Sequence, residues 1–384
     1  MNIYIHIPFC QQKCTYCKFA ITPVFDDYKK KKYLHFLENE IKNTLVQKNI
    51  KKVNTIYFGG GTPSILSADE IKKILELFPE WAQEISFESN PEDLSENFLE
   101  QIFSLWINRL SIGIQSLNPK TLESVERSST ESIFSALESL QNFKVWKFIL
   151  FWNKKISINI DFILGLPYTK KWEIFEHIKY LHEKYPFITH TSVYFLEKWL
   201  YPKNWQKLSI SEMEMIAEYA KICDFFEKKW WNHYEISIEE LERAGFEHYE
   251  ISNFSAPWFE CQHNQWYWNH IDTLGFWLSA SGFEKISEWK FVGKRKTNAL
   301  SFSGYYKWKM AEEEYIDEGQ IELEKLLFGM RTNGYSVNPR IPIVSEEKVQ
   351  RFLEQKFLEG TIQKFRVTQK WMPIIDRIID DIIL

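Results

Sequence analysis

Short runs of β-branched and aromatic residues alternate with longer helical patterns over the first 200 residues. The predicted strands span residues 3–7, 55–58, 85–88, 109–114, 156–163 and 191–196, and the predicted helices span residues 26–47, 68–78, 95–105, 119–143 and 170–185. Strands that alternate with helices favour a parallel sheet with right-handed crossovers. Six such units are too few for a complete eight-stranded barrel, so we expect an α/β fold with a partial (β/α)6 barrel or an open sheet.

The second half of the chain follows a different, mixed pattern. A helix is predicted at 211–229, and further helices at 305–316, 323–330 and 346–358. A short strand pair at 362–367 and a helix at 374–383 give the end of the chain a winged-helix-like order. No basic stripe accompanies it, which favours packing over DNA binding. We therefore expect one domain over residues 1–232 and a C-terminal mixed α/β domain over 233–384.

Composition and charge exclude several classes of protein. Hydrophobic residues make up 45% and charged residues 26% of the chain, as is typical of globular proteins. The formal net charge of −5 provides no basic field for nucleic acid. No apolar run is long enough to span a membrane, and the N-terminus lacks the layout of a signal peptide. We expect a cytoplasmic protein with no nucleic-acid partner and no integral membrane segment.

Three of the five cysteines, Cys10, Cys14 and Cys17, lie within eight residues. Without a secretory signal, such a cluster indicates metal binding in a reducing compartment. Three thiolates on one loop can each bind one iron of a cubane cluster and leave the fourth iron open. A structural zinc site needs four ligands, and no fourth follows at a fitting spacing, since His6 belongs to a predicted strand. Zinc or chance clustering remains the alternative.

A second motif is the run Gly59, Gly60, Gly61 and Thr62, which follows a predicted strand. Glycines let the backbone approach a ligand closely and leave N–H groups free to donate. The run matches neither a dinucleotide-binding nor a P-loop motif. A tight turn between strand and helix is the alternative explanation.

Polar side chains stand at or near the carboxyl ends of predicted strands, within otherwise apolar runs. They are Glu88, Asn90, Gln115 and Asp161. In parallel α/β folds that edge is where ligands bind. One such residue would more often cap a strand, but four beside the cysteines and glycines predict a binding site.

The cysteine loop with Tyr16 resembles the radical S-adenosylmethionine (SAM) superfamily. More narrowly, the chain is similar to the heme chaperone branch of the oxygen-independent coproporphyrinogen III oxidase-like family. The segments that carry this resemblance are, in order, IHIPFC, YFGGGTPS, ESNP, NRLSIGIQS, IDFILGLP, YEISNF, HNQWYW and MRTNGY. The similarity spans essentially the whole chain, and it implies a radical SAM barrel followed by a HemN-like C-terminal domain.

The resemblance implies a 4Fe–4S cluster on Cys10, Cys14 and Cys17, with SAM on the fourth iron. The positions that match SAM contacts in the family are Tyr4, Tyr16, Gly60, Gly61, Thr62, Glu88, Gln115, Arg127 and Asp161. Carboxylates suit the ribose hydroxyls and amino group of SAM, and an arginine suits its carboxylate. In the superfamily, an electron from the cluster cleaves SAM to a radical, so an electron donor such as flavodoxin or ferredoxin is a possible partner.

Features of the branch favour a heme chaperone that passes heme to an acceptor protein. The coproporphyrinogen dehydrogenases that resemble this chain carry a further cysteine where Phe19 stands, and an N-terminal arm before the first strand. His263, with Asn264, Tyr267 and Trp268, is similar to a motif associated with heme, and imidazole is a suitable iron ligand. A hydrogen-bonded loop histidine is the alternative. One alternative function is a coproporphyrinogen III dehydrogenase, which decarboxylates two propionates. The other is a non-catalytic scaffold that carries the cluster.

Tryptophan is unusually frequent, with 16 residues against only 14 glycines. The family has glycine where this chain has Trp106, Trp199, Trp258, Trp277 and Trp371. At the positions that Glu126 and Ser129 occupy in this chain, the family has glycine and histidine. An indole cannot replace a glycine that needs positive φ or close backbone approach. Our hypothesis is that UGA codons decoded as glycine have been read as tryptophan.

Overall fold

The computed structural model describes residues 1–23, 25–79, 82–143, 155–170, 173–196, 238–239, 241–288, 290–307, 310–332 and 334–384. The predicted helix at 211–229, Trp199, Cys223 and the expected domain boundary near residue 232 lie outside these ranges. No helix in the described ranges is long and apolar enough to cross a membrane.

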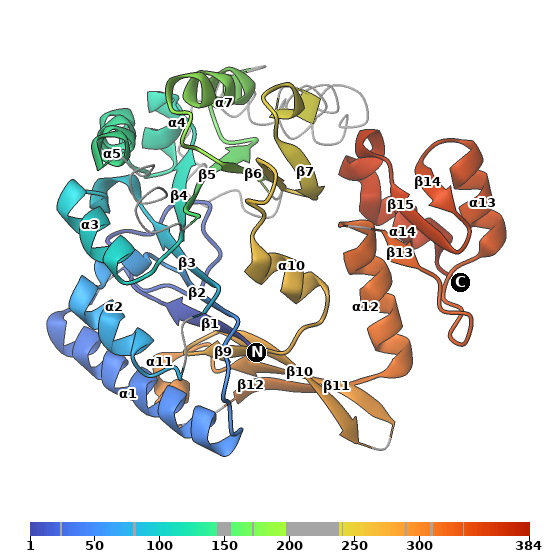
Figure 1. Cartoon of the computed structure of the whole chain (residues 1–384), viewed down its shortest axis with the longest axis horizontal. Coiled ribbons are helices and arrows are strands. Elements are labelled where there is room, and N and C mark those ends of the chain that lie inside the picture. The colour runs from blue at the N-terminus through green and yellow to red at the C-terminus, as the bar shows by residue number, and fades with distance from the viewer. Residues whose placement is uncertain are drawn as a thin grey trace, which may run out of the picture.

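Parallel strands form the centre of the molecule, in the order of the sequence. They are β1 (Asn2–Ile7), β2 (Thr55–Gly60), β3 (Glu84–Ser89), β4 (Arg109–Gln115), β5 (Ser157–Leu164) and β6 (His190–Phe195). The helices that follow them lie along the outer side of the sheet, as Figure 1 shows. They are α1 (Asp27–Gln47), α2 (Ala68–Leu75), α3 (Glu96–Ser104), α4 (Pro119–Ser124), α5 (Thr130–Phe143) and α7 (Glu173–Lys184). The described strands form an open row that does not close into a barrel, which confirms the predicted α/β fold with a partial barrel or open sheet.

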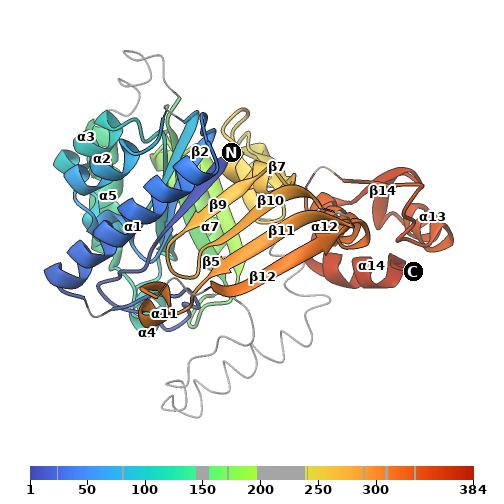
Figure 2. The same cartoon turned by 90° about the horizontal axis from the view of Figure 1, so that it is seen from below.

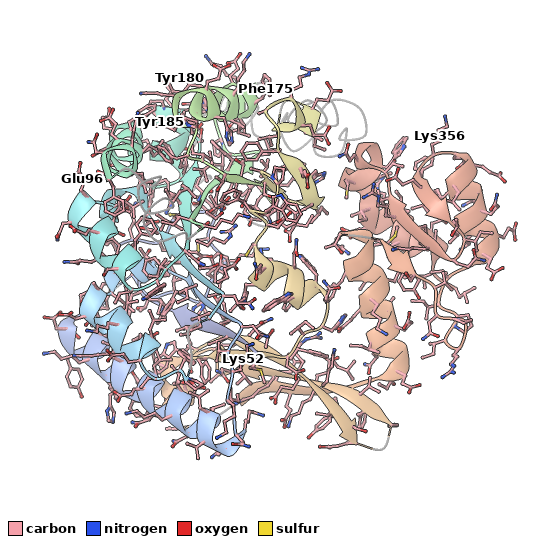
Figure 3. All side chains as sticks on the ribbon, viewed as in Figure 1. Lys52, Glu96, Phe175, Tyr180, Tyr185 and Lys356 are labelled. Atoms are coloured by element: carbon pink, nitrogen blue, oxygen red, sulfur yellow. The ribbon has the colours of Figure 1, made fainter. Side chains whose placement is uncertain are left out.

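Local sequence signals set where several of these helices begin. Ser67 and Glu70 form the capping box of α2, and Ser95 caps α3 by accepting from the N–H of Phe98. Burial differs sharply between neighbouring aromatic side chains near the end of α7. Tyr185, at the end of α7, is fully buried, whereas Tyr180 on α7 is 45% exposed (Figure 3).

Later strands extend the sheet at both ends. β9 (Thr273–Phe276) pairs in parallel with β1, and β10 (Ser281–Glu288), β11 (Phe291–Asn298) and β12 (Met310–Asp317) continue from it as antiparallel strands (Figure 2). At the other end, β8 (Asn253–Ser255) and β7 (Glu247–Glu250) follow β6. The described strands of this sheet thus come from both halves of the chain.

The predicted helix at 305–316 is wrong. A short helix, α11 (Phe302–Tyr305), ends at the residue where the predicted helix begins. Residues 310–317 instead form the edge strand β12. Basic residues on β11 face acidic ones on β12, so Lys294 pairs with Glu313 and Arg295 with Glu314. Cross-strand pairs of opposite charge stabilise a hairpin, and this non-local partner overrides the helical propensity of the glutamates.

The C-terminal segments form a smaller unit beyond the long helix α12 (Glu318–Met330), at the right of Figure 1. It contains β13 (Tyr335–Ser336), α13 (Glu346–Glu354), β14 (Leu358–Thr361), β15 (Lys364–Val367), the 3-10 helix η5 (Gln369–Ile374) and α14 (Ile375–Ile382). The three strands pair in the order β13–β15–β14. The described elements follow the expected order of helix, strand pair and helix. The predicted position of the pair at 362–367 is wrong, because that range contains only β15 and β14 lies before it at 358–361.

Three tryptophans adopt a backbone conformation that favours glycine. The φ angles are 69° at Trp106, 74° at Trp258 and 80° at Trp277, and Glu126 has a φ of 54°. All four are positions where the resemblance implies glycine. Trp371, in η5, has no positive φ. Trp277 is also fully buried, and its indole N–H finds no hydrogen-bond partner among the residues that the structure describes.

Candidate functional site

The cysteine loop follows β1 at the carboxyl edge of the parallel sheet. The hydroxyl of Thr62 donates to the Cys10 sulfur at 3.4 Å, and Arg127 Nη1 donates to the Cys14 sulfur at 3.7 Å. Burial raises the pKa of Cys10 to about 11; the nearby Cys17 and Cys14 also raise it, whereas the Thr62 hydrogen bond lowers it. The three thiols therefore share one small region that holds a basic side chain.

The geometry of the three thiols bears on the type of metal. No group of three or more His, Cys, Asp or Glu side chains in the described part of the chain is arranged to hold a metal ion. A cubane cluster gives each cysteine its own iron, so its ligands need not converge on one point. The loop fits such a cluster.

The glycine run packs against the cysteine loop. The N–H of Gly61 donates to the Ile7 carbonyl at 2.7 Å, and a Cβ at Gly61 would lie 2.5 Å from the Phe9 carbonyl oxygen and 3.0 Å from the Cys10 sulfur. The N–H of Thr62 donates to the Phe9 carbonyl at 2.8 Å. We predicted close approach of a ligand, but the nearest neighbour of Gly61 is this chain's own cysteine loop.

Glu88 lies one residue before the end of β3, as predicted. Its Oε1 accepts from the Tyr57 hydroxyl at 2.8 Å and its Oε2 accepts from the Gly60 N–H at 3.1 Å. Burial raises the pKa of Glu88 to about 7; the Asp161 charge adds to this, while the bonds from Tyr57 and Gly60 oppose it. Glu88 is thus a carboxyl group whose charge changes near neutral pH.

Two further predicted residues sit on β4 and β5. Gln115 ends β4 with a φ of 69° and an 8% exposed side chain, beside an irregularity in the β4–β5 pairing. Asp161 is the fifth residue of β5 rather than its end. It accepts from Ser111 at 2.9 Å and from Asn159 at 2.8 Å, and burial raises its pKa.

Arg127 holds a position between the cysteine loop and β4. Its Nη2 donates to the Gly113 carbonyl at 2.6 Å, on the strand that ends with Gln115. Its Nε is buried without a hydrogen-bond partner among the described residues. A partly buried guanidinium that retains an unsatisfied N–H is suited to bind the carboxylate of a ligand. This unpartnered atom is the structural observation that fits bound SAM.

The remaining predicted rim residues lie close by. The Tyr4 hydroxyl is 3.1 Å from His6 Nδ1, and Tyr16 lies near Arg127 and Cys14, where burial raises the pKa of its phenol. Asn90 donates to the Thr62 hydroxyl at 3.2 Å. The structure therefore gathers the predicted residues along one edge of the sheet.

His263 lies at the other end of the strands, in the first turn of helix α10 (Gln262–Trp268). Its Nδ1 is 2.7 Å from the Thr55 hydroxyl, and its ring centroid is 5.1 Å from that of Tyr57. Burial, together with the charge of Arg109, lowers the pKa of His263 to about 3, so the imidazole is neutral. His263 is hydrogen-bonded, as the alternative explanation held, but it belongs to a helix and not to a loop.

The sequence reasoning missed the residue that holds α10 in place, Glu84 at the start of β3. Its carboxylate accepts from the N–H of Gln262 at 2.8 Å and of His263 at 3.1 Å. A carboxylate at a helix N-terminus satisfies the unpaired N–H groups and suits the helix dipole. Glu84 acts across 178 residues of sequence, which no local pattern reveals.

A buried chain of hydrogen bonds was also missed, and it joins the rim to α10. Asn159, which bonds Asp161, lies 2.6 Å from His190 Nδ1, and His190 Nε2 lies 2.7 Å from the Tyr249 hydroxyl. That hydroxyl accepts from the N–H of Cys261, the N-cap residue of α10, at 3.2 Å. The available signal was the alternation of polar residues along β5 (Ser157, Asn159, Asp161) and β6 (His190, Ser192, Tyr194), which is the period of one strand face.

Comparisons with known proteins identify the fold and the family of the chain. Residues 4–181 match the Radical SAM superfamily. The structure of coproporphyrinogen III oxidase (HemN) from Escherichia coli superposes with a TM-score of 0.74 at 20% identity, covering 99% of this chain and 89% of that one. Fold and cysteine loop together define a radical SAM protein, a class whose members use a 4Fe–4S cluster and SAM.

Sequence similarity identifies the branch of that superfamily. The heme chaperone HemW of Buchnera aphidicola subsp. Acyrthosiphon pisum is 32% identical over 292 residues, which cover 73% of this chain and 70% of that protein. The heme chaperone HemW of Lactococcus lactis subsp. lactis is 28% identical and covers 100% of this chain and 97% of its own length. The chain belongs to the HemW family.

Proposed function

We propose that this protein binds heme and transfers it to an acceptor protein, while carrying a 4Fe–4S cluster and SAM. The observation that carries the proposal is His263, a neutral imidazole fixed through one nitrogen. Its Nδ1 bonds to Thr55, and no hydrogen bond joins its Nε2 to any described residue. A metal-binding histidine characteristically uses one ring nitrogen for the metal and the other for an orienting hydrogen bond.

The helix around His263 suits a porphyrin. Tyr267 is 44% exposed on α10, and the Trp268 ring packs at 5.1 Å from Phe328 of α12. Aromatic faces of this kind can cover an apolar macrocycle. The acceptor protein would meet heme at this exposed side of α10.

At the opposite edge, this chain's residues would hold SAM beside the cluster on Cys10, Cys14 and Cys17. Arg127, with its unpartnered Nε, would bind the carboxylate of SAM. Glu88 and Asp161 would bind its amino group and ribose hydroxyls. The bound cluster would supply an electron to SAM, received from a donor such as flavodoxin or ferredoxin.

One observation bears on the competing enzyme, a coproporphyrinogen III dehydrogenase. Phe19 is 62% exposed at the position where the dehydrogenases that resemble this chain carry a cysteine. A phenyl ring cannot ligate iron or donate a proton, so this position cannot supply the chemistry of a thiol. We therefore favour the chaperone.

An anaerobic heme titration of the cluster-reconstituted protein, followed at the Soret band, tests the proposal. We expect saturation near one heme per chain, and about tenfold weaker binding in His263→Ala. His35→Ala, on the exposed surface of α1, is the matched control and should bind as the wild type does. Decarboxylated porphyrinogen formed with SAM turnover, and no specific heme binding, would instead establish the dehydrogenase.

A further inference from the structure

A cavity of about 720 Å³ lies beside α10, between β10, β11, α12 and the segment around β13. Trp268, the last residue of α10, forms part of its wall, so one short helix carries both His263 and a wall of this cavity. The volume falls within the range of about 300–1,000 Å³ that is typical of small-molecule sites. Figure 1 shows α12 standing between the sheet and the C-terminal unit, next to α10.

Part of the cavity wall is formed by apolar side chains. Ile286, Val292, Ile321 and Ile341 line the cavity, and each is only partly buried. Partly exposed aliphatic side chains that face one cavity offer an apolar surface for a ligand.

The basic residues of the lining are Lys285, Lys325 and Arg340. Lys325 is paired with Glu322 at 3.2 Å, whereas the described residues provide no ion-pair partner for the side chains of Lys285 and Arg340. Glu318 is the one acidic residue of the described lining without such a partner, so the unpaired charges of the wall are positive on balance. The cavity thus suits a ligand with an apolar body and more than one acidic group.

We propose that this cavity binds the carboxylate-bearing edge of heme, with Lys285 and Arg340 pairing with its two propionates. The inference rests on the proposed function, because heme is the ligand that it extends. Heme has the required chemistry: a flat apolar macrocycle with both carboxylates on one edge. His270 also lines the cavity, held by Glu324 at 3.0 Å from its Nε2, so an imidazole stands in the same wall.

The test compares two ligands and three proteins. Heme and heme dimethyl ester, which lacks the negative charges, are titrated in the same dilute detergent into the cluster-reconstituted full chain. The proteins are the wild type, the double variant Lys285→Gln/Arg340→Gln, and the control Lys51→Gln/Lys52→Gln. The control removes the same charge at exposed residues before β2, outside the cavity; Lys52 is labelled in Figure 3.

We expect the wild type to bind heme about tenfold more tightly than the ester. The double variant should bind heme about fivefold more weakly and the ester unchanged, since each exposed ion pair is worth little. The control should match the wild type. Equal heme affinity in the double variant and the wild type would overturn this inference and leave the proposed function intact. Equal losses for heme and ester would also overturn it, and no heme binding by the wild type would overturn both.

Discussion

The hydroxyl of Thr55, the first residue of β2, lies 2.7 Å from Nδ1 of His263 on α10. The two residues are 208 positions apart in the sequence, and the bond fixes the tilt of a neutral imidazole. Whatever binds Nε2 therefore meets a ring whose orientation is already set.

Removal of the Thr55 hydroxyl should weaken heme binding, although His263, the proposed iron ligand, stays in place. Thr55→Val keeps the shape of the side chain but leaves Nδ1 of His263 without its partner. Loss of such an orienting bond typically lowers metal affinity by tenfold or more, so we expect about tenfold weaker heme binding in a Soret titration. Thr368→Val removes a hydroxyl bond to the Lys356 carbonyl in the C-terminal unit and serves as the control. Unchanged affinity in Thr55→Val would contradict a role for His263 as an iron ligand.

SAM affinity should depend on pH through Glu88. With a pKa of about 7, this carboxyl is mostly neutral at pH 6 and mostly ionised at pH 8. The ionised form attracts the cationic groups of SAM, so anaerobic calorimetry should show about tenfold tighter binding at pH 8. Glu88→Gln should bind weakly at both pH values. A wild type with the same affinity at pH 6 and pH 8 would contradict the prediction.

The same shift acts on the stability of the ligand-free protein. The folded state raises the pKa of Glu88 from its ordinary 4.5, so folding favours the protonated form. The contribution of Glu88 to the free energy of unfolding is fully present below pH 4.5 and is lost as the pH rises through about 7. Bound SAM should offset that loss.

A methyl group at Gly61 should displace the cluster loop. The added Cβ would lie 2.5 Å from the Phe9 carbonyl oxygen, and backbone cannot yield as a flexible side chain can. We expect Gly61→Ala to retain about half or less of the wild-type iron after reconstitution, measured by iron assay and cluster absorbance. Gly319→Ala is the control, because its Cβ would meet only the Asp317 carboxylate at 3.4 Å. Full iron content in Gly61→Ala would show that the loop position does not depend on this packing.

The tryptophans at positive φ should be stabilised by glycine. Trp258 is 82% exposed, so Trp258→Gly removes little packing and relieves a left-handed backbone; we expect a gain of about 1 kcal/mol in the free energy of unfolding. Trp371 has no positive φ, and its ring stacks on Phe357 with centroids 4.1 Å apart. Trp371→Gly should therefore cost about 2 kcal/mol. Denaturant unfolding of both variants provides the comparison.

Peptide masses from the native host test the origin of these residues directly. Glycine at 106, 258 and 277 would confirm that UGA codons encode it there. Tryptophan at these positions would refute the hypothesis and leave a chain that stores backbone strain at three sites.

The parallel strands could be predicted because they are buried runs bounded by helices with clear N-caps. β4, for example, is buried along its whole length, and its pattern is continuous rather than dependent on a distant partner. The strand β12 could not be predicted in this way. Its glutamates favour a helix locally, and only the lysine and arginine of β11 make a strand the better choice.

In the candidate site, too, some residues could be predicted from local sequence and others could not. The cysteine spacing is local, so the sequence alone indicated its chemistry. Other residues act through contacts with residues far along the chain, namely Glu84, Thr55 and His190. The sequence does not reveal with which distant residue a polar residue in a strand forms a hydrogen bond. The resemblance pointed to His263, but only the folded chain shows that a hydroxyl and a carboxylate fix it.

The contact between Glu84 and α10 limits how a cargo could leave this protein. If the helix moved away, the Glu84 carboxylate would lose the two N–H donors of α10 while remaining in the interior of the sheet. Of the described donors to this buried carboxylate, the Ser86 hydroxyl at 3.1 Å would remain. Losing the other donors is costly for a buried charge, so we expect α10 to stay in a fixed position. If the protein transfers heme as proposed, an acceptor would have to approach α10 and take the heme from the exposed side of that helix, so the selectivity of delivery would depend on which protein surfaces can dock there.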